Sequence, residues 1–207
     1  MMNFQLTEEQ LAVQEAARDF AQSELLPKVI ERDTEARFPK EQIQKMGALG
    51  FMGMMVDPAY GGGGMDTISY VIAMEELSKI DASASVSMSV NNSLVCWGLE
   101  NYGTEEQKQR YLTKLATGAQ LGAFCLSEPE AGSDATSQQT TATLEGDYYL
   151  LNGTKNWITN GSSASIYLVI AQTDASKGHK GISAFIVEKG WDGFVVGKKE
   201  DKLGIRG

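Results

Sequence analysis

Hydrophobic residues recur at a helical spacing through the first half of the chain. After Thr7, whose hydroxyl can form a capping box with Gln10, apolar positions follow this spacing until Pro27 interrupts it. A second capping box, Thr104-Glu105-Glu106-Gln107, predicts another helix further along. Between these two boxes, helices are expected at 39–47, 68–80 and 82–102. The first half of the sequence is therefore predicted to be all-helical.

Short β-rich runs replace the helical spacing from about residue 121 onward. Turn dipeptides such as Gly146-Asp147 and Asn152-Gly153 separate these runs. Strands are expected at 140–144, 148–152, 166–173, 182–188 and 194–198. Because helices come first and strands second, we expect an α+β fold. Its parts would be a helical domain at 1–120 and an antiparallel, β-barrel-like domain at 121–207 that is incomplete at its C-terminus.

Composition and charge narrow the classes of function. The net charge of −9 argues against nucleic-acid binding, which requires clustered Lys and Arg. Cys96 and Cys125 lie far apart in apolar contexts, so a disulfide framework is not expected. No apolar run is long enough to span a bilayer, and no secretory or transit peptide is recognisable. A reducing compartment is expected, either the bacterial cytoplasm or an organellar matrix.

Several conspicuous segments are better interpreted as structural. The run Gly61–Gly64 lacks the Gly-Lys-Ser/Thr ending of a phosphate loop and is expected to be a turn before a helix. The acidic group Glu128, Glu130 and Asp134 is spaced too irregularly for a known cation loop, so no metal site is expected. Asp134 is instead expected to cap the residues that follow it. His179, the single histidine, is expected at a solvated hairpin tip.

Two segments of the second half have the features that a flavin requires. The segment 124–134 is an apolar strand that leads through a kinked acidic loop to a Gly-Ser pair. The segment 155–161 adds an indole and a threonine hydroxyl. Together they can supply backbone donors, a hydroxyl near the hydride-accepting nitrogen and an apolar face. Trp157, taken alone, would more simply be a sheet-core residue.

The motifs Leu-Ser-Glu-Pro-x-Ala-Gly-Ser-Asp (126–134) and Trp-Ile-Thr-Asn-Gly (157–161) resemble those of the acyl-CoA dehydrogenase family, and the resemblance extends in order along the whole chain. It implies FAD as the cofactor. It also places Ser133 at the acyl-CoA substrate, while Glu130 stands where the family commonly has glycine. The residues implied at the flavin are Phe124, Cys125, Leu126, Ser127, Gly132, Ser133, Trp157, Ile158 and Thr159.

The resemblance implies an oxidoreductase of fatty acid metabolism that desaturates an acyl-CoA thioester. A carboxylate removes the α proton while hydride passes from the β carbon to the flavin. The family's glutamate base belongs to a C-terminal helical domain, and no residue up to Gly207 matches it. We therefore expect the isolated chain to be inactive and to retain flavin weakly. An electron-transfer flavoprotein as acceptor and a homo-oligomeric full-length protein are also implied.

Substrate length and two other functions stay open at this point. The segment 87–94 looks similar to short-chain members, but branched, glutaryl and medium-chain thioesters are not excluded. A non-catalytic flavin-binding or interaction module could share the fold. An acyl-CoA oxidase or flavin monooxygenase would differ in how the reduced flavin reacts with oxygen.

Overall fold

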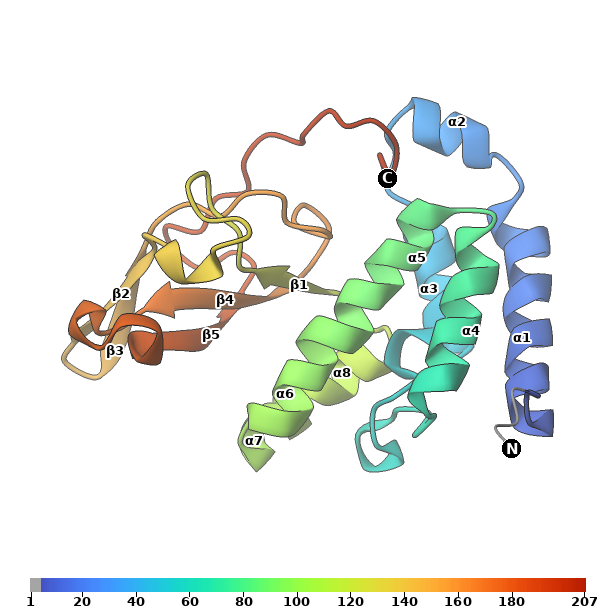
Figure 1. The fold of residues 1–207 in the computed structure, drawn as a ribbon, viewed down its shortest axis with the longest axis horizontal. Coiled ribbons are helices and arrows are strands. Elements are labelled where there is room, and N and C mark those ends of the chain that lie inside the picture. Colours follow the sequence, from blue (N-terminus) through green and yellow to red (C-terminus); the bar gives the residue numbers. More distant parts are fainter. Residues whose placement is uncertain (1–4) are drawn as a thin grey trace. The chain divides into compact units, whose positions relative to one another are not determined.

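The computed structural model describes residues 5–207, which form two compact units (Figure 1). Unit 1 comprises residues 5–120 together with 201–207, and unit 2 comprises residues 121–200. No helix within 5–207 has the length and apolar character needed to cross a membrane. Helices make up unit 1 and strands dominate unit 2, so the α+β class expected from the sequence is confirmed.

Unit 1 is a set of packed helices. Its α-helices are α1 (Glu8–Phe20), α2 (Val29–Thr34), α3 (Lys40–Ala48), α4 (Thr67–Ser78), α5 (Ala82–Ser89), α6 (Trp97–Tyr102), α7 (Glu105–Gln107) and α8 (Thr113–Ala116). π-helical turns at Ala21–Leu25, Val90–Cys96 and Lys108–Leu112 continue α1, α5 and α7, and 3-10 turns lie at Phe51–Gly53 and Pro58–Tyr60. The helices expected from the spacing of apolar residues are confirmed, whereas α2, which begins two residues after Pro27, was not expected.

Both predicted capping boxes are present. The backbone N–H of Gln10 donates to the Thr7 hydroxyl at 3.2 Å, and the N–H of Thr7 donates to the Gln10 side chain at 3.1 Å. Thr104 and Gln107 make the same reciprocal pair at 3.3 and 2.9 Å. These bonds satisfy N–H groups that a helix start otherwise leaves unpaired, which is why the two boxes mark the starts of α1 and α7.

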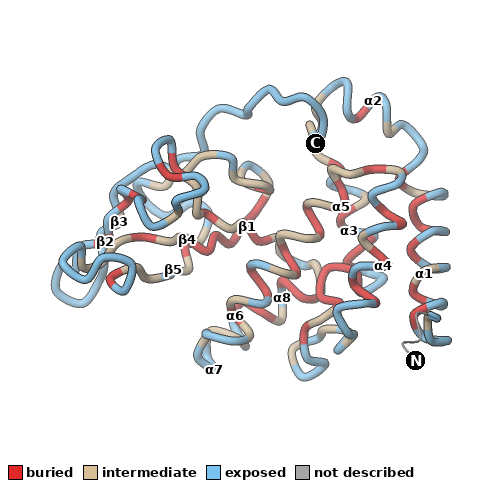
Figure 2. The backbone as a smooth tube through the Cα atoms, in the orientation of Figure 1, coloured by how far each residue is buried: buried red, intermediate tan, exposed pale blue. Residues whose placement is uncertain are grey.

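The core of unit 1 is mainly apolar, and two asparagines are among the polar side chains buried in it. Buried faces of the helices turn toward one another (Figure 2), with fully buried methionines and leucines between them. The Asn91 amide donates to the carbonyls of Met52 and Leu115, at 2.8 and 3.0 Å. Asn92 accepts from the Met54 N–H at 2.8 Å. These side chains thus bind the backbone at and next to the Phe51–Gly53 turn.

The glycine run forms the turn that the sequence predicts. The N–H groups of Gly63 and Gly64 donate to the carbonyls of Gly53 and Val56, both at 2.9 Å. A Cβ on Gly62 would lie 2.1 Å from the Val56 carbonyl oxygen, so only glycine fits there. Because these amides are used within the fold, they are not available to hold a phosphate. Asp66 then caps α4 by accepting from the Ser69 N–H at 2.7 Å.

Unit 2 is built on a mixed sheet. Its strands are β1 (Gly122–Cys125), β2 (Thr141–Glu145), β3 (Tyr148–Asn152), β4 (Ile166–Gln172) and β5 (Ile182–Glu188). β4 pairs with β1 and β2 in parallel and with β5 antiparallel, and β2 and β3 form an antiparallel hairpin. The sheet is not closed. The prediction of a purely antiparallel sheet was therefore wrong about the direction of two strand pairs. The long connection from 126 to 165 lets the chain cross over, so that β4 runs beside β1 in the same direction.

One predicted strand does not form. Residues 194–198 have no strand pairing within the described chain, and Val195 is 84% exposed. Phe194 instead packs against the ring of Tyr167, with the ring centroids 4.5 Å apart. Tyr167 belongs to the sheet core, together with Ala123, Cys125, Ala164, Val169 and Val187. An apolar, β-prone run needs a free sheet edge to pair with, and that is decided by tertiary structure.

Candidate functional site

The two segments expected at a flavin lie side by side within unit 2. The backbone N–H of Asn156 donates to the Ser127 carbonyl at 2.8 Å, and the Lys155 ammonium donates to the Leu126 carbonyl at 3.0 Å. Further along, the Asn160 side-chain amide donates to the Gly122 carbonyl at 3.0 Å. The structure thus brings together the end of β1 and the segment 155–160, although about thirty residues separate them in sequence.

The loop after β1 is closed by a tight turn. Glu128 and Ala131 exchange backbone hydrogen bonds of 2.9 and 3.2 Å, so Pro129 and Glu130 lie exposed at the tip. Glu130, which replaces the glycine common in the resembled family, therefore lies where its side chain has free space. Asp134 accepts from the Thr136 N–H at 3.2 Å and caps the 3-10 turn at Ala135–Ser137, as expected. Hydrogen bonds from the Ser137 and Thr136 side chains lower the pKa of Asp134.

Trp157 is not a core residue. Its side chain is 63% exposed, and its backbone lies in the left-handed region with φ of 59°. Asn160 follows with φ of 66°. A bulky residue rarely adopts this conformation, and such outliers cluster at ligand sites. The exposed indole contradicts the interpretation of Trp157 as a sheet-core side chain.

Backbone donors at the meeting point of the two segments are not used by the protein. No acceptor within residues 5–207 pairs with the N–H groups of Leu126, Ser127, Ile158 or Thr159, and the hydroxyls of Ser127 and Thr159 are likewise without a partner there. All four residues are partly buried. Buried backbone donors are almost always paired, so a partly buried set of this kind is suited to an acceptor-rich ligand. A flavin, with its carbonyl oxygens and ring nitrogens, fits this donor set.

The remaining predicted residues are placed differently. Cys125 belongs to the sheet core, and burial raises the pKa of its thiol to about 12, so only its backbone is available to a ligand. Phe124, its neighbour on β1, points to the opposite face and is partly buried. Gly132 and Ser133 are exposed beyond the turn. Within the described residues, no hydrogen bond connects Gly132 or Ser133 to the segment 155–161.

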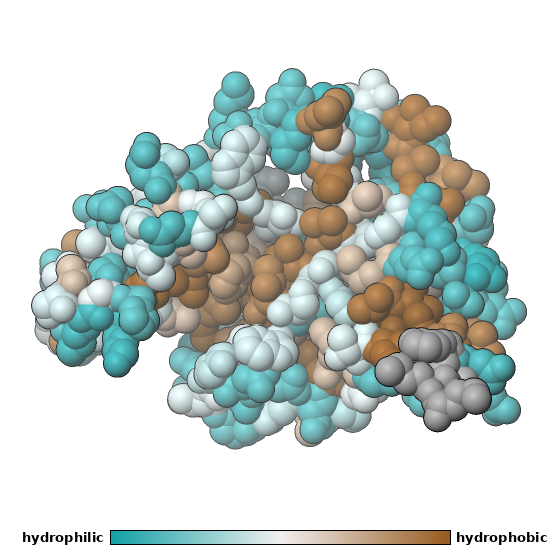
Figure 3. All heavy atoms as spheres, in the orientation of Figure 1, coloured by the Kyte–Doolittle hydropathy of each residue, from teal (hydrophilic) through white to brown (hydrophobic). Residues whose placement is uncertain are grey.

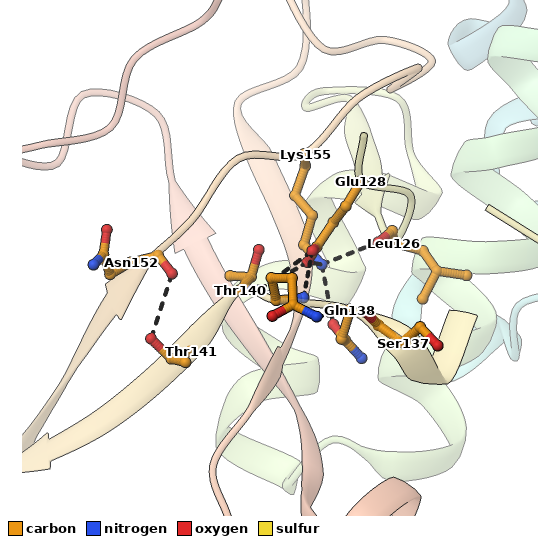
Figure 4. Close-up of polar contacts among 9 residues, drawn as sticks. Leu126, Glu128, Ser137, Gln138, Thr140, Thr141, Asn152 and Lys155 are labelled. Carbon is orange, nitrogen blue, oxygen red and sulfur yellow. Dashed lines mark hydrogen bonds and ion pairs between the residues drawn. The ribbon is translucent and has the colours of Figure 1, made fainter. Parts of the chain in front are cut away.

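An ion pair that the sequence analysis did not identify joins the two segments (Figure 4). The Lys155 ammonium lies 2.7 Å from the Glu128 carboxylate, and these side chains are only 9% and 3% exposed. Burial works to raise the pKa of Glu128, but hydrogen bonds from Lys155, Thr140 and Gln139 outweigh it and hold that pKa at about 2. The sequence signal for this pair was one acid in the segment 124–134 and one base in the segment 155–161.

Acid is expected to destabilise unit 2 through Glu128. Its pKa falls from 4.5 to about 2 on folding, so its stabilisation is complete above about pH 4.5 and is lost as the pH falls toward 2. The shift corresponds to on the order of 3 kcal/mol. Urea denaturation in a Trp97→Phe background, where tryptophan fluorescence reports unit 2, should show this loss between pH 5 and 2.5. Glu128→Gln should flatten that dependence; an equally steep loss in this variant would contradict it.

No metal centre is found in the described part of the chain. Residues 5–207 contain no group of three or more His, Cys, Asp or Glu side chains placed to hold an ion. Glu128 is engaged by Lys155 and backbone amides, and Asp134 by its own cap. His179 is exposed in the Ala175–Gly181 turn between β4 and β5, as expected for a solvated tip. Cys96 and Cys125 are both free and buried.

Two family models together match almost the whole chain. The model of the acyl-CoA dehydrogenase N-terminal domain matches residues 7–119, and the model of the middle domain matches residues 123–207. The chain therefore belongs to the acyl-CoA dehydrogenase family, as the motifs around Leu126 and Trp157 indicated.

Among individual relatives, the chain is similar to short-chain members of the family. The short-chain specific acyl-CoA dehydrogenase of Clostridium acetobutylicum is 51% identical over 205 residues, which is 99% of this chain and 54% of that protein. The structure of butyryl-CoA dehydrogenase from Megasphaera elsdenii has a TM-score of 0.94 at 47% identity, over 99% of this chain and 55% of that one. A chain in the structure of the electron transferring flavoprotein of Acidaminococcus fermentans has a TM-score of 0.96 at 50% identity, over 99% and 54%. The chain spans about half the length of the curated relatives it matches.

Proposed function

We propose that this chain supplies FAD-binding and substrate-binding surfaces of an acyl-CoA dehydrogenase that desaturates a short-chain acyl-CoA between its α and β carbons. The observation that carries the proposal is the set of unpaired donors where the two segments meet, at Leu126, Ser127, Ile158 and Thr159. FAD, when bound, supplies the hydride acceptor for this reaction. In this proposal residues 1–120 form a helical domain and 121–207 a middle β domain.

Each part of the site has a separate role in this proposal. The N–H groups of Leu126 and Ser127 bind the acceptor edge of the flavin, while the Thr159 hydroxyl lies near its hydride-accepting nitrogen. The exposed Trp157 indole covers an apolar face of the flavin ring. Phe124, Cys125 and Gly132 contribute backbone or ring surface along the same loop. Ser133, exposed beyond the turn, contacts the flavin and the acyl-CoA.

The relatives support a proposal for the substrate and the partners. Two of the three relatives described above carry short-chain or butyryl names, which favours a short acyl group. The likeness to a chain in an electron transferring flavoprotein structure favours such a flavoprotein as electron acceptor. The full-length protein is proposed to be a homo-oligomer. The free, buried cysteines are in keeping with a reducing compartment, such as the bacterial cytoplasm or a mitochondrial matrix.

FAD binding tests this proposal. Titrating the 207-residue chain into FAD should quench flavin fluorescence and sharpen the visible absorption, with saturation at one FAD per chain. Ser127→Ala combined with Thr159→Val removes two unpaired hydroxyls and should weaken binding roughly 30-fold, since each hydrogen bond contributes about 1 kcal/mol. The matched control, Ser176→Ala with Thr173→Val, changes hydroxyls that bind within the protein. Absence of FAD binding by the unmodified chain would contradict the proposal.

A non-catalytic flavin-binding module is the second candidate. It shares the same donors, so FAD binding alone does not separate it from a dehydrogenase. Acyl-CoA binding does, because only the dehydrogenase proposal requires a substrate surface at Ser133. Bleaching of the flavin by butyryl-CoA in the full-length protein would support the dehydrogenase, and slow reaction of the reduced flavin with oxygen would separate it from an oxidase.

A further inference from the structure

The buried ion pair between the two segments has its hydrogen bonds satisfied by backbone and side-chain groups of the protein. The three ammonium protons of Lys155 have three acceptors, namely the Leu126 carbonyl at 3.0 Å, Glu128 at 2.7 Å and the Gln138 side chain at 3.1 Å. Figure 4 shows these partners converging on the Lys155 ammonium from separate stretches of chain. A buried pair stabilises only when its geometry and remaining hydrogen bonds are satisfied, and here they are.

Lys155 controls the direction of a donor that the protein leaves unpaired. The Leu126 carbonyl and the Ser127 N–H belong to one planar trans peptide, in which the two groups point in opposite directions. Fixing the carbonyl on the Lys155 ammonium therefore fixes the N–H on the far side. A cationic donor on the carbonyl also polarises the peptide and makes its N–H a stronger donor. The neighbouring peptide is fixed in turn, because the Ser127 carbonyl accepts from the Asn156 N–H at 2.8 Å.

Glu128 anchors this arrangement to the sheet. Its carboxylate accepts from the N–H groups of Gln139 and Thr140, directly before β2, as well as from Lys155. The position of the ammonium is thus set by the sheet rather than by the exposed loop tip. Three stretches, 126–128, 138–140 and 155–156, meet at this pair. Loss of either charge would leave the other buried without its counter-charge.

We propose that Lys155 and Glu128 form a positioning pair that holds the Leu126–Ser127 peptide against the segment 157–159, and so sets the affinity and the surroundings of the bound flavin. This inference rests on the proposed function, since it concerns the same site. Neither side chain is a catalytic residue, because both act through the backbone that they orient. In metal sites, residues that hydrogen-bond to the metal ligands fix the direction of those ligands. Lys155 and Glu128 fix the direction of the backbone groups that bind the flavin in the same way.

The test compares FAD affinity and the visible spectrum of bound flavin in four variants of the 207-residue chain. Lys155→Met and Glu128→Gln each remove one charge, and Lys155→Arg keeps it. Lys177→Met is the matched control, because Lys177 forms an exposed ion pair with Asp174 at 2.9 Å. Far-UV circular dichroism establishes that each variant is folded before the titration.

Lys155→Met and Glu128→Gln should raise the FAD dissociation constant roughly 10- to 100-fold, the range found when outer partners of metal ligands are removed. The visible band of bound flavin should lose its fine structure in both. Lys155→Arg should recover part of the affinity, and Lys177→Met should stay within about twofold of the unmodified chain. A merely structural pair would lower stability and leave affinity and spectrum unchanged.

Three results would overturn the proposal. The first is a folded Lys155→Met or Glu128→Gln that binds FAD like the Lys177→Met control. The second is failure of both variants to fold, since the pair would then be a requirement for folding. The third is failure of the unmodified chain to bind FAD, which removes the flavin function itself. This last result differs from the first two because it appears before any substitution is made.

Discussion

The isolated 207-residue chain is expected to oxidise butyryl-CoA at least about 10⁴-fold more slowly than a full-length relative. Absence of a positioned general base costs about 10²- to 10⁴-fold, and the chain spans only about half the length of the relatives it matches. Two carboxylates of the flavin loop, Glu128 and Asp134, are unsuited to substitute for that base. Glu128 has a pKa of about 2 and is ion-paired, so it is too weak a base for an α proton. Asp134 has a lowered pKa and caps its own turn.

An artificial electron acceptor and butyryl-CoA give the direct measurement of this loss. The chain should be saturated with FAD, so that weak cofactor retention does not explain a low rate. Butyryl-CoA dehydrogenase from Megasphaera elsdenii, which shares 47% identity with the chain, serves as the positive control. Turnover by the chain within about a hundredfold of that enzyme would mean that a base lies within the 207 residues, and the account would be wrong on this point.

Arg32→Met is expected to cost unit 1 about 3–5 kcal/mol of unfolding free energy, the usual cost of removing one partner of a buried pair. Arg32 is 4% exposed and lies 2.9 Å from Asp81. It also donates to the carbonyl oxygens of Pro27, at 2.7 Å, and of Leu25. Asp81 in turn caps α5 by accepting from the Ala84 N–H at 3.1 Å. The substitution would leave this carboxylate buried without a counter-charge.

Arg37→Met provides the matched control. Arg37 pairs with Glu31 and Glu35, but all three side chains are about half exposed. Exposed pairs contribute about 0–1 kcal/mol, so this variant should unfold at nearly the same urea concentration as the unmodified chain. Far-UV circular dichroism, dominated by the helices of unit 1, follows both transitions. Equal losses in the two variants would contradict the importance assigned to burial.

Local signals in the sequence were enough to predict most helices. Thr7 and Thr104 begin helices because each satisfies backbone donors within four residues, a bond that depends on no distant partner. The β2–β3 hairpin was equally local, with Gly146 at φ of 66° in its turn. α2 was missed because a helix of six residues owes its stability to tertiary contacts, here those of the buried Arg32.

Strand direction and partners could not be predicted from the same signals. The parallel pairing of β1 with β4 joins residues more than forty positions apart, and alternation of apolar residues is the same in either direction. The run 194–198 was predicted as a strand on propensity alone, but within the described chain it has no partner strand.

Apolar surface lies over the α2 region of unit 1 (Figure 3), where Leu26 and Ile30 are 47% and 80% exposed.

The candidate site was predicted in part. The motifs identified the two segments, and the structure brings them together through Asn156 and Ser127. The roles assigned to single residues within these segments stay predictions. The pair of Glu128 with Lys155 was missed because 27 residues separate the two charges and many acids and bases in the chain are equally spaced. Only the fold selects this acid and this base.

The most direct test of the central claim follows backbone amide hydrogen exchange of the 207-residue chain with and without saturating FAD. If segments 124–133 and 157–159 surround one flavin, exchange at Leu126, Ser127, Ile158 and Thr159 should slow together at the same FAD concentration. Exchange in the Ala175–Gly181 turn should not change. Binding of FAD with protection in only one of the two segments, or elsewhere in the chain, would contradict the account.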